Sequence, residues 1–209
     1  MKPSVKAVVR RVAVITGLAA LLLLAWNVPT LLTAGTPAVR AEIAAITGNP
    51  PDDPVLDGSA DRIVYPRLYI DAPYTESAHT SPLDSEDWNN IRSALTQGAS
   101  LNFAGASFDD SSFSYLTGHS SDTYPHPYSS VFAALGQAKP GDTFYVTGGD
   151  KIRKYVVKST QVIEPTDLNA FSQASLTSGM GATQHIALVT CWPLFTSLRR
   201  MVVVGELVV

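Results

Sequence analysis

Cysteine is almost absent from this chain, whose 209 residues include only one, Cys191. An intramolecular disulfide is therefore excluded, and an exported domain would have to be held together by its core alone. Cys191 ends the apolar run Ile186–Cys191 and precedes Arg200 by nine residues. A free cysteine is usually a small buried hydrophobic residue, whereas a thiol beside a positive charge or a base is a nucleophile. The rest of the chain has to decide between these two interpretations.

Acidic residues are absent before Glu42, whereas four basic residues precede position 12. Residues 12–34 carry no charge, and a helix of this length spans a hydrocarbon core of about 30 Å. Basic residues flanking such a helix stay on the cytoplasmic side. The sequence therefore predicts a cytoplasmic basic tail over residues 1–11, a transmembrane anchor over residues 12–34 and an extracytoplasmic remainder. The predicted location is the plasma membrane, crossed once.

A cleavable signal peptide is the alternative to this anchor. Small residues that suit cleavage follow the apolar stretch at positions 33–35 and 36–38. The stretch is longer than the usual apolar core of a signal peptide. An uncleaved anchor is therefore favoured.

An excess of basic residues is also missing. Without the four N-terminal bases, 11 basic and 18 acidic residues leave the outer part with a net charge of −7. A surface of this sign repels a polyanion, so nucleic acid is excluded as a partner. The chain also has no internal repeat and no low-complexity tract.

What the sequence does contain is an ordered series of short β-type runs. Residues 35–60 are rich in Pro, Gly and Asp and predict an extracytoplasmic linker. Beyond them, amphipathic segments over residues 86–97 and 129–135 predict two short helices. Many short strands with few helices indicate a mostly β fold, a closed or nearly closed barrel of about eight strands. The expected strands cover residues 63–66, 68–70, 113–116, 143–147, 152–163, 184–191 and 200–209.

His119 follows one of these expected strands, directly after Gly118, which allows close backbone approach. Cysteine and histidine are the minimal set for acyl transfer, because the thiol attacks a carbonyl and the imidazolium protonates the departing amine. Arg200 supplies a permanent charge that can hold the oxyanion or the substrate backbone. Alone, each of these residues has an ordinary structural explanation.

The other histidines are weaker candidates. His185 and Cys191 are six residues apart on one expected strand, which separates them by about 20 Å. They cannot be partners. His126 and His79 lie in loops and are expected on the surface, with His126 a weak candidate for the mouth of the site.

Together, Thr117-Gly118-His119, then Leu188-Val189-Thr190-Cys191, then Arg200 followed by Met-Val-Val-Val-Gly resemble the sortase family of cysteine transpeptidases. The resemblance covers residues 61–209 and implies a sortase-like β-barrel as the catalytic domain. The N-terminal anchor fits the topology common in that family. Further segments stand where sortases carry similar ones: Ile63–Pro66, Ile70–Pro73, Gly118–Asp122, Lys139–Asp142 and Glu164–Asp167.

The resemblance implies that Cys191 is the nucleophile, His119 the general acid and base, and Arg200 the residue that stabilises the oxyanion or positions the substrate. Arg199 competes with Arg200, but neighbouring strand residues point to opposite faces, so only one can face the thiol. In the family the arginine stands five residues before a small residue of the last strand, here Gly205, which selects Arg200. Substrate contacts are expected from Thr190, Ser120 and Trp192.

The activity implied is cleavage of a C-terminal sorting motif similar to Leu-Pro-x-Thr-Gly through a Cys191 thioester. The acyl group then passes to an amine of a cell-wall precursor or a pilin subunit. The partners are accordingly surface proteins with a sorting signal and that amine. No cofactor or metal is expected, because no acidic cluster has convincing ligand spacing.

The chain also departs from the family pattern. Residues 100–114 lack the His-Tyr-Pro-Gly-Thr-like stretch of many sortases. The resemblance therefore predicts no substrate contacts from this segment. Asp53-Pro54-Val55 lacks the aromatic residue of the lid found in pilin-polymerising members, so we interpret it as linker. The sortase class is left unassigned.

Two other classes of protein are open. An L,D-transpeptidase needs Ser-x-Gly-Cys-x-Arg, which Val189-Thr190-Cys191-Trp192-Pro193 does not supply. A non-catalytic, membrane-anchored β-barrel acting as a binding module would not need three reactive residues. Their retention argues against it.

Overall fold

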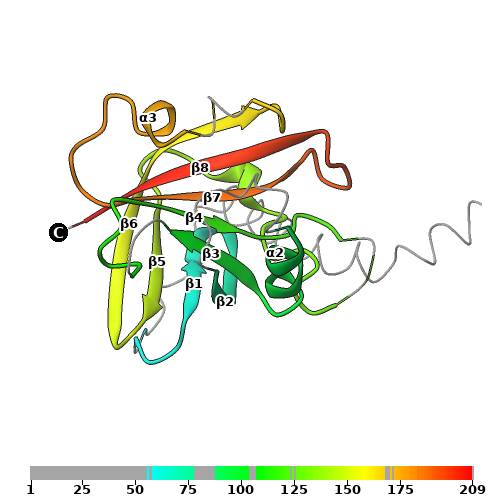
Figure 1. Ribbon diagram of the computed structural model, residues 1–209, viewed down its shortest axis with the longest axis horizontal. Helices are drawn as coiled ribbons and strands as arrows, with labels where there is room; N and C mark the ends of the chain where they lie inside the picture. The colour runs from blue at the N-terminus through cyan, green and yellow to red at the C-terminus, as the bar shows by residue number, and fades with distance from the viewer. Residues whose placement is uncertain are drawn as a thin grey trace, which may run out of the picture.

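The computed structural model describes residues 56, 58–77, 88–103, 107–122, 124, 126–167, 170 and 172–208, and every structural statement below concerns these. Eight strands form one closed barrel in the order β1-β2-β3-β4-β7-β8-β6-β5 (Figure 1). The strands are β1 (Arg62–Tyr65), β2 (Ile70–Ser77), β3 (Ala99–Phe103), β4 (Phe113–Thr117), β5 (Thr143–Gly148), β6 (Lys151–Ile163), β7 (His185–Trp192) and β8 (Arg199–Leu207). The helices are η1 (Pro66–Leu68), α2 (Trp88–Leu95), η2 (Leu135–Gln137) and α3 (Gln173–Leu176).

The predicted fold class is confirmed: the domain is mostly β, closed by eight strands and carrying a few short helices. Strands β2 and β3 pair in parallel, as do β4 and β7, and the remaining neighbours are antiparallel. Within the described part of the chain, no helix has the length and apolar character required to cross a membrane. The predicted anchor over residues 12–34 lies outside that part.

Side chains of the barrel wall divide between two apolar clusters. On β7, Ile186 and Leu188 belong to the cluster inside the barrel, whereas Ala187 and Val189 belong to a second cluster on the outer face. This alternation follows from the two-residue period of a strand. The second cluster is closed by Leu176 of α3 and by the end of β6. Strand β7 is therefore buried on both faces, which explains its continuous apolar run.

Three local elements differ from the sequence-based predictions. Strand β3 was not expected. Residues 129–135 were expected as a helix but form successive turns in which several N–H groups bond the carbonyl three residues earlier, as from Ser129 to His126 and from Ala133 to Ser130. Strand β2 does not cover the expected residues 68–70 but runs from Ile70 to Ser77, because it pairs with β1 up to Pro73 and with β3 from Tyr74 onward.

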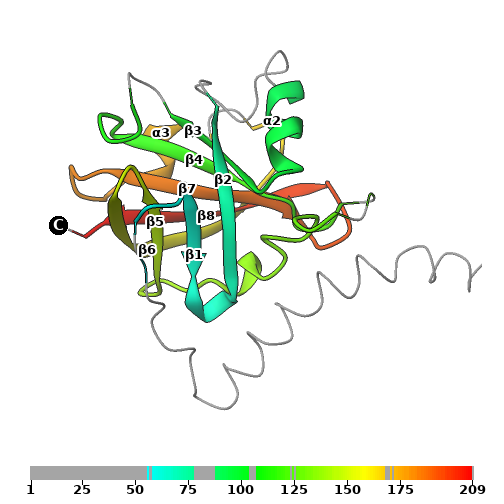
Figure 2. The same ribbon diagram turned by 90° about the horizontal axis from the view of Figure 1, so that it is seen from below.

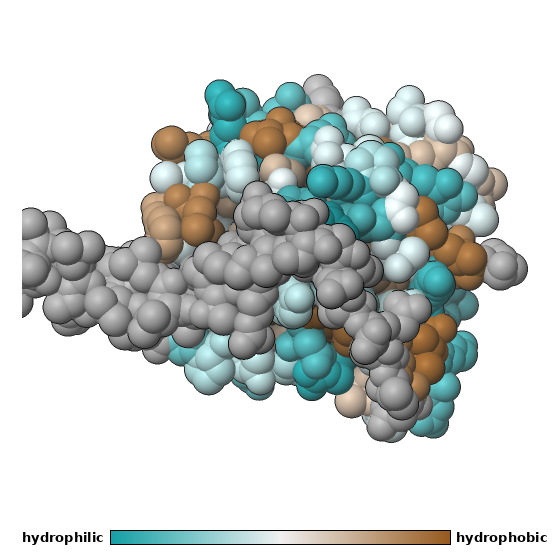
Figure 3. All heavy atoms as spheres, turned by 180° about the vertical axis from the view of Figure 1, so that it is seen from behind, coloured by the Kyte–Doolittle hydropathy of each residue, from teal (hydrophilic) through white to brown (hydrophobic). Residues whose placement is uncertain are grey.

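The two ends of β7 lie at opposite ends of the molecule. In both ribbon views, helix α2 and the turn between β7 and β8 lie at one end and the C-terminus lies at the other (Figures 1 and 2). On the visible part of the back face, hydrophobic residues form separate small groups among hydrophilic ones (Figure 3). Such scattered apolar residues are ordinary for a protein surface.

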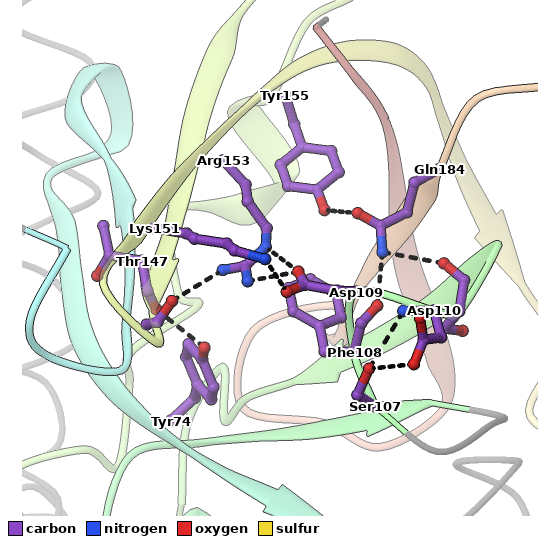
Figure 4. Close-up of polar contacts among 12 residues, drawn as sticks. Tyr74, Ser107, Phe108, Asp109, Asp110, Thr147, Lys151, Arg153, Tyr155 and Gln184 are labelled. Atoms are coloured by element: carbon purple, nitrogen blue, oxygen red, sulfur yellow. Dashed lines mark hydrogen bonds and ion pairs between the residues drawn. The ribbon is translucent and has the colours of Figure 1, made fainter.

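A polar network closes the barrel near the start of β7. Gln184 donates to the carbonyls of Phe108 and Ser111 at 2.7 and 2.9 Å and accepts from the Tyr155 hydroxyl at 2.7 Å. Beside it, Asp109 accepts from Lys151 at 2.6 Å and from Arg153 at 2.7 Å (Figure 4). These bonds tie the loop between β3 and β4 to β6. The Gln184 side chain alone forms hydrogen bonds with two carbonyls and one hydroxyl of buried residues.

Replacing Gln184 with leucine should lower the free energy of unfolding by about 3 kcal/mol, because the Tyr155 hydroxyl and the Ser111 carbonyl lose the hydrogen bonds that Gln184 gives them and the Phe108 carbonyl keeps only the longer bond from the Ser111 N–H. Urea unfolding measures this as a lower midpoint with an unchanged slope. The matched control is Gln173→Leu, since the Gln173 side chain is exposed and its one hydrogen bond to a described residue goes to Ser112 Oγ at 3.2 Å. Equal effects of the two substitutions would contradict the assigned role of Gln184.

Candidate active site

Cys191 lies near the end of β7, half-buried, on the outer face of the barrel. Its backbone pairs directly with Arg200 of β8, and paired residues of adjacent strands present their side chains on the same face. Val189 lies two residues earlier on that face, within the second apolar cluster. The thiol therefore stands where the apolar outer face meets solvent, with a cation on the neighbouring strand.

His119 lies beside Cys191 along the direction of β7, on the β4 side of that strand. Strand β4 pairs in parallel with β7 up to Thr117 opposite Val189. The contact continues past the strand: the Gly118 N–H donates to the Val189 carbonyl at 3.0 Å, and the Thr190 hydroxyl donates to the Gly118 carbonyl at 2.7 Å. Thr117 and Val189 are paired, and His119 and Cys191 each follow two residues later on neighbouring chain segments. Paired strands lie about 4.8 Å apart, so His119 and Cys191 are neighbours.

Gly118 is required for this approach. A Cβ atom at this position would lie 2.7 Å from the Phe132 ring and 2.8 Å from Val131, closer than packed atoms allow. The Phe132 N–H also donates to the His119 carbonyl at 2.8 Å. The segment after β4 therefore packs against residues 131–132, and this packing sets the position of His119.

Arg200 and Arg199 are separated by the alternation of β8. Arg200 pairs with Cys191 and Arg199 with Trp192. Arg199 forms an exposed ion pair with Glu164 at 2.8 Å. Arg200 donates from one guanidinium nitrogen to the carbonyls of Ser197 and Arg199, both at 3.0 Å. Its other N–H groups contact none of the described residues, so they can donate to a ligand on the thiol's face.

The side chain of His119 lies against Asp122 and His126. Asp122 Oδ2 is 3.4 Å from His119 Nε2 and 3.3 Å from His126 Nε2, and the two imidazole rings meet edge to face with centroids 5.5 Å apart. Asp122 Oδ1 accepts from the Tyr124 N–H at 3.2 Å. His126, expected on the surface or, as a weaker candidate, at the mouth of the site, is only 16% exposed and lies against the His119 ring.

These neighbours set the charge states. Burial lowers the pKa of His119; the Asp122 carboxylate opposes this, His126 and Arg92 add to it, and the pKa lies below its ordinary value. Burial raises the pKa of Asp122, but the Tyr124 N–H and the two imidazoles outweigh it, so this pKa is lowered. At neutral pH the His119 ring is therefore mainly neutral beside an ionised carboxylate.

The expected substrate contacts Thr190, Ser120 and Trp192 are placed differently from Cys191. Thr190 is buried and bonded to the Gly118 carbonyl, and Trp192 packs against the inner core cluster. Both alternate with Cys191 on β7 and face the opposite side. Ser120 is buried, and its hydroxyl has no hydrogen-bond partner among the described residues. The structure thus gives Thr190 and Trp192 packing contacts rather than positions beside the thiol.

Sequence reasoning did not find Asp122 and His126 as neighbours of His119. The spacing His-x-x-Asp-x-x-x-His is visible in residues 119–126 and could have suggested that they meet. It could not decide it, because a loop with two prolines has no periodicity from which to place side chains.

A family model described as the Sortase domain matches residues 66–208. The chain belongs to the sortase family. Members of this family are cysteine transpeptidases. The match spans every strand of the barrel except β1 and includes Cys191, His119 and Arg200. No curated protein matches the chain.

Solved sortase structures resemble this sortase in fold. Sortase E1 from Streptomyces coelicolor has a TM-score of 0.53 and 22% identity, over 75% of this chain and 92% of that one. Sortase C-1 from Actinomyces oris has a TM-score of 0.52 and 22% identity, over 84% of this chain and 99% of that one. Sortase C-1 from Streptococcus pneumoniae has a TM-score of 0.52 and 23% identity, over 74% and 69%. At these identities the likeness concerns the fold alone.

Proposed function

We propose that this sortase cleaves a C-terminal sorting motif similar to Leu-Pro-x-Thr-Gly and transfers the new carboxyl end to an amine. The observation that carries the proposal is the register of the adjacent strands β4, β7 and β8. It brings His119, Cys191 and Arg200 side by side across the sheet. Acyl transfer needs a nucleophile, a proton carrier and an oxyanion partner within reach of one carbonyl.

In the first half-reaction the neutral His119 ring accepts the Cys191 proton. The thiolate attacks the carbonyl of the threonine-like residue, and the oxyanion that forms is held by Arg200. The intermediate collapses to a thioester as the C–N bond breaks, and the glycine amine leaves with the proton from the His119 imidazolium. Peptide cleavage is thus complete while the acyl group remains on the enzyme.

In the second half-reaction an acceptor amine attacks the thioester and gives its proton to His119. The new amide forms as the C–S bond breaks, and the departing Cys191 thiolate takes the proton from the His119 imidazolium, which restores the starting enzyme. The acceptor we propose is an amine of a cell-wall precursor or a lysine of a pilin subunit. The basic tail and uncharged stretch of residues 1–34 support a plasma-membrane anchor with the catalytic domain outside.

The experiment is to incubate the full-length chain with a library of sorting-signal peptides and candidate amines and to read the products by mass. We expect a thioester-linked enzyme and, with the right amine, a peptide that has lost the residues after threonine and gained the amine. Peptide binding without any cleavage would instead support a non-catalytic binding module.

A further inference from the structure

Three potential metal ligands, one of them His119 of the proposed active site, lie close together. The ligand atoms of His119, Asp122 and His126 all lie within 4.8 Å of one another. Asp122 Oδ2 is 3.4 Å from one Nε2 atom and 3.3 Å from the other. Two ligands that bind zinc at about 2.0–2.1 Å in a tetrahedral arrangement stand about 3.4 Å apart. Two edges of the required tetrahedron are therefore already formed.

The backbone holds these ligands in place. The Asp122 N–H donates to the Ser129 carbonyl at 2.7 Å, and the Ser129 N–H donates to the His126 carbonyl at 3.0 Å. The His119 carbonyl accepts from Phe132 at 2.8 Å. Because these backbone bonds fix each ligand residue against residues 129–132, an incoming ion would find its three ligands already close together. Such a site avoids most of the entropy cost of assembling its ligands.

One contact must change when a metal binds. His126 Nδ1 accepts from the Tyr128 N–H at 3.3 Å, so the neutral ring carries its proton on Nε2, facing Asp122. Coordination through Nε2 requires that proton to move to Nδ1, which breaks the contact with Tyr128. At 3.3 Å this bond is longer than ordinary N–H donor bonds, and its loss is small beside three metal–ligand bonds.

The ligand set selects the kind of ion. Two imidazoles and one carboxylate suit first-row transition metals, whereas calcium and magnesium prefer oxygen ligands. The three side chains retain between 16% and 22% exposure, so an ion can enter and a water molecule can fill the fourth tetrahedral position. Zinc has no geometric preference from its d electrons and fits this arrangement.

We propose that His119, Asp122 and His126 bind a divalent transition-metal ion such as zinc, and that this ion inhibits the enzyme by holding the His119 imidazole. The His119 ring lies against Asp122 and His126, and coordination would occupy its Nε2 and hold the ring in that position, so that this nitrogen could not accept the Cys191 proton. The binding stands on geometry alone, whereas the inhibition rests on the proposed role of His119. The sequence predicted no metal site, because no acidic cluster has convincing ligand spacing, and the approach of these three side chains is a feature of the tertiary structure.

Binding is tested in the full-length Cys191→Ala chain, in which the thiol cannot be a ligand. Zinc is titrated against a chromophoric chelator, and cobalt is added separately so that its visible absorption reports coordination. We expect one ion per chain and at least about tenfold weaker binding after His126→Gln or Asp122→Asn, the least that loss of a ligand should cause. His185→Gln is the matched control, because His185 lies at the other end of β7. Absence of binding, or equal affinity in all variants, would overturn the proposal.

Inhibition is tested in the chain that retains Cys191, with each variant's cleavage rate divided by its own zinc-free rate. Zinc should inhibit the native chain, a chelator should restore it, and His126→Gln should need at least about tenfold more zinc. Calcium and magnesium should not inhibit. If zinc binds as expected but no peptide is cleaved, the metal site stands and the proposed function fails. If peptide is cleaved and zinc neither binds nor inhibits, the metal site fails and the function stands.

Discussion

Replacing Cys191 with alanine should abolish peptide cleavage, with a rate loss of at least about 10⁴-fold, as when other covalent catalysts lose their nucleophile. The covalent acyl-enzyme should also disappear from the mass spectrum. The reason is that every bond change in the proposed reaction passes through this sulfur atom. No other residue can replace it, because Cys191 is the chain's sole cysteine.

The fold should survive this change. Cys191 is half-buried, and no described residue forms a hydrogen bond or ion pair with its sulfur, so the free energy of unfolding should change by less than about 1 kcal/mol. Thermal unfolding of the variant provides that control. A mild alkylating reagent should inactivate the native chain and leave the alanine variant unlabelled. Peptide cleavage remaining in the alanine variant would show that Cys191 is not the nucleophile. Slow labelling of the native thiol would favour the non-catalytic binding module.

Replacing Arg200 with methionine should lower kcat/KM by about 10²–10³-fold, the usual loss when one oxyanion donor is removed. The prediction depends on β8 placing this side chain on the thiol's face, paired with Cys191. Arg200→Lys should recover only part of the activity, because it keeps the charge but loses the planar guanidinium. A loss confined to kcat would assign the oxyanion role, and a rise in KM alone would assign substrate positioning.

The neighbouring arginine provides the matched control. Arg199→Met removes the same side chain one position earlier, where it pairs with Trp192 and forms an exposed ion pair with Glu164. Exposed ion pairs contribute at most about 1 kcal/mol, and this one does not face the thiol, so activity should stay within about threefold of the native chain. An equal loss in both methionine variants would show that the alternation of β8 does not select the catalytic arginine.

Local sequence pattern predicted six of the eight strands to within two residues at each end, and failed at β2 and β3. The continuous apolar runs of β7 and β8 gave predicted limits within two residues of those observed. Strand β3 was missed, because Ala99–Phe103 alternates small, polar and apolar residues, and its polar members Ser100 and Asn102 are buried. Polar side chains inside a strand carry no signal of burial when the covering layer is unknown.

Sequence pattern also predicted part of the candidate site. Cys191, His119 and Arg200 were singled out by their residue types and by strand-end positions. Asp122 and His126 were not joined to them, because their approach depends on a loop held by backbone bonds such as Asp122 to Ser129. Side-chain directions in a non-periodic segment follow from its own hydrogen bonds and not from residue spacing.

By itself, the sequence determined that this protein has one thiol, an excess of acidic residues after position 11 and a mostly β domain, since composition and two-residue periodicity are local properties of the chain. Only the tertiary structure decided that β4 lies parallel to β7, with β8 on the other side. That pairing joins segments distant in sequence and is set by how the whole barrel buries its apolar faces. The same pairing places His119 and Arg200 on either side of the single cysteine.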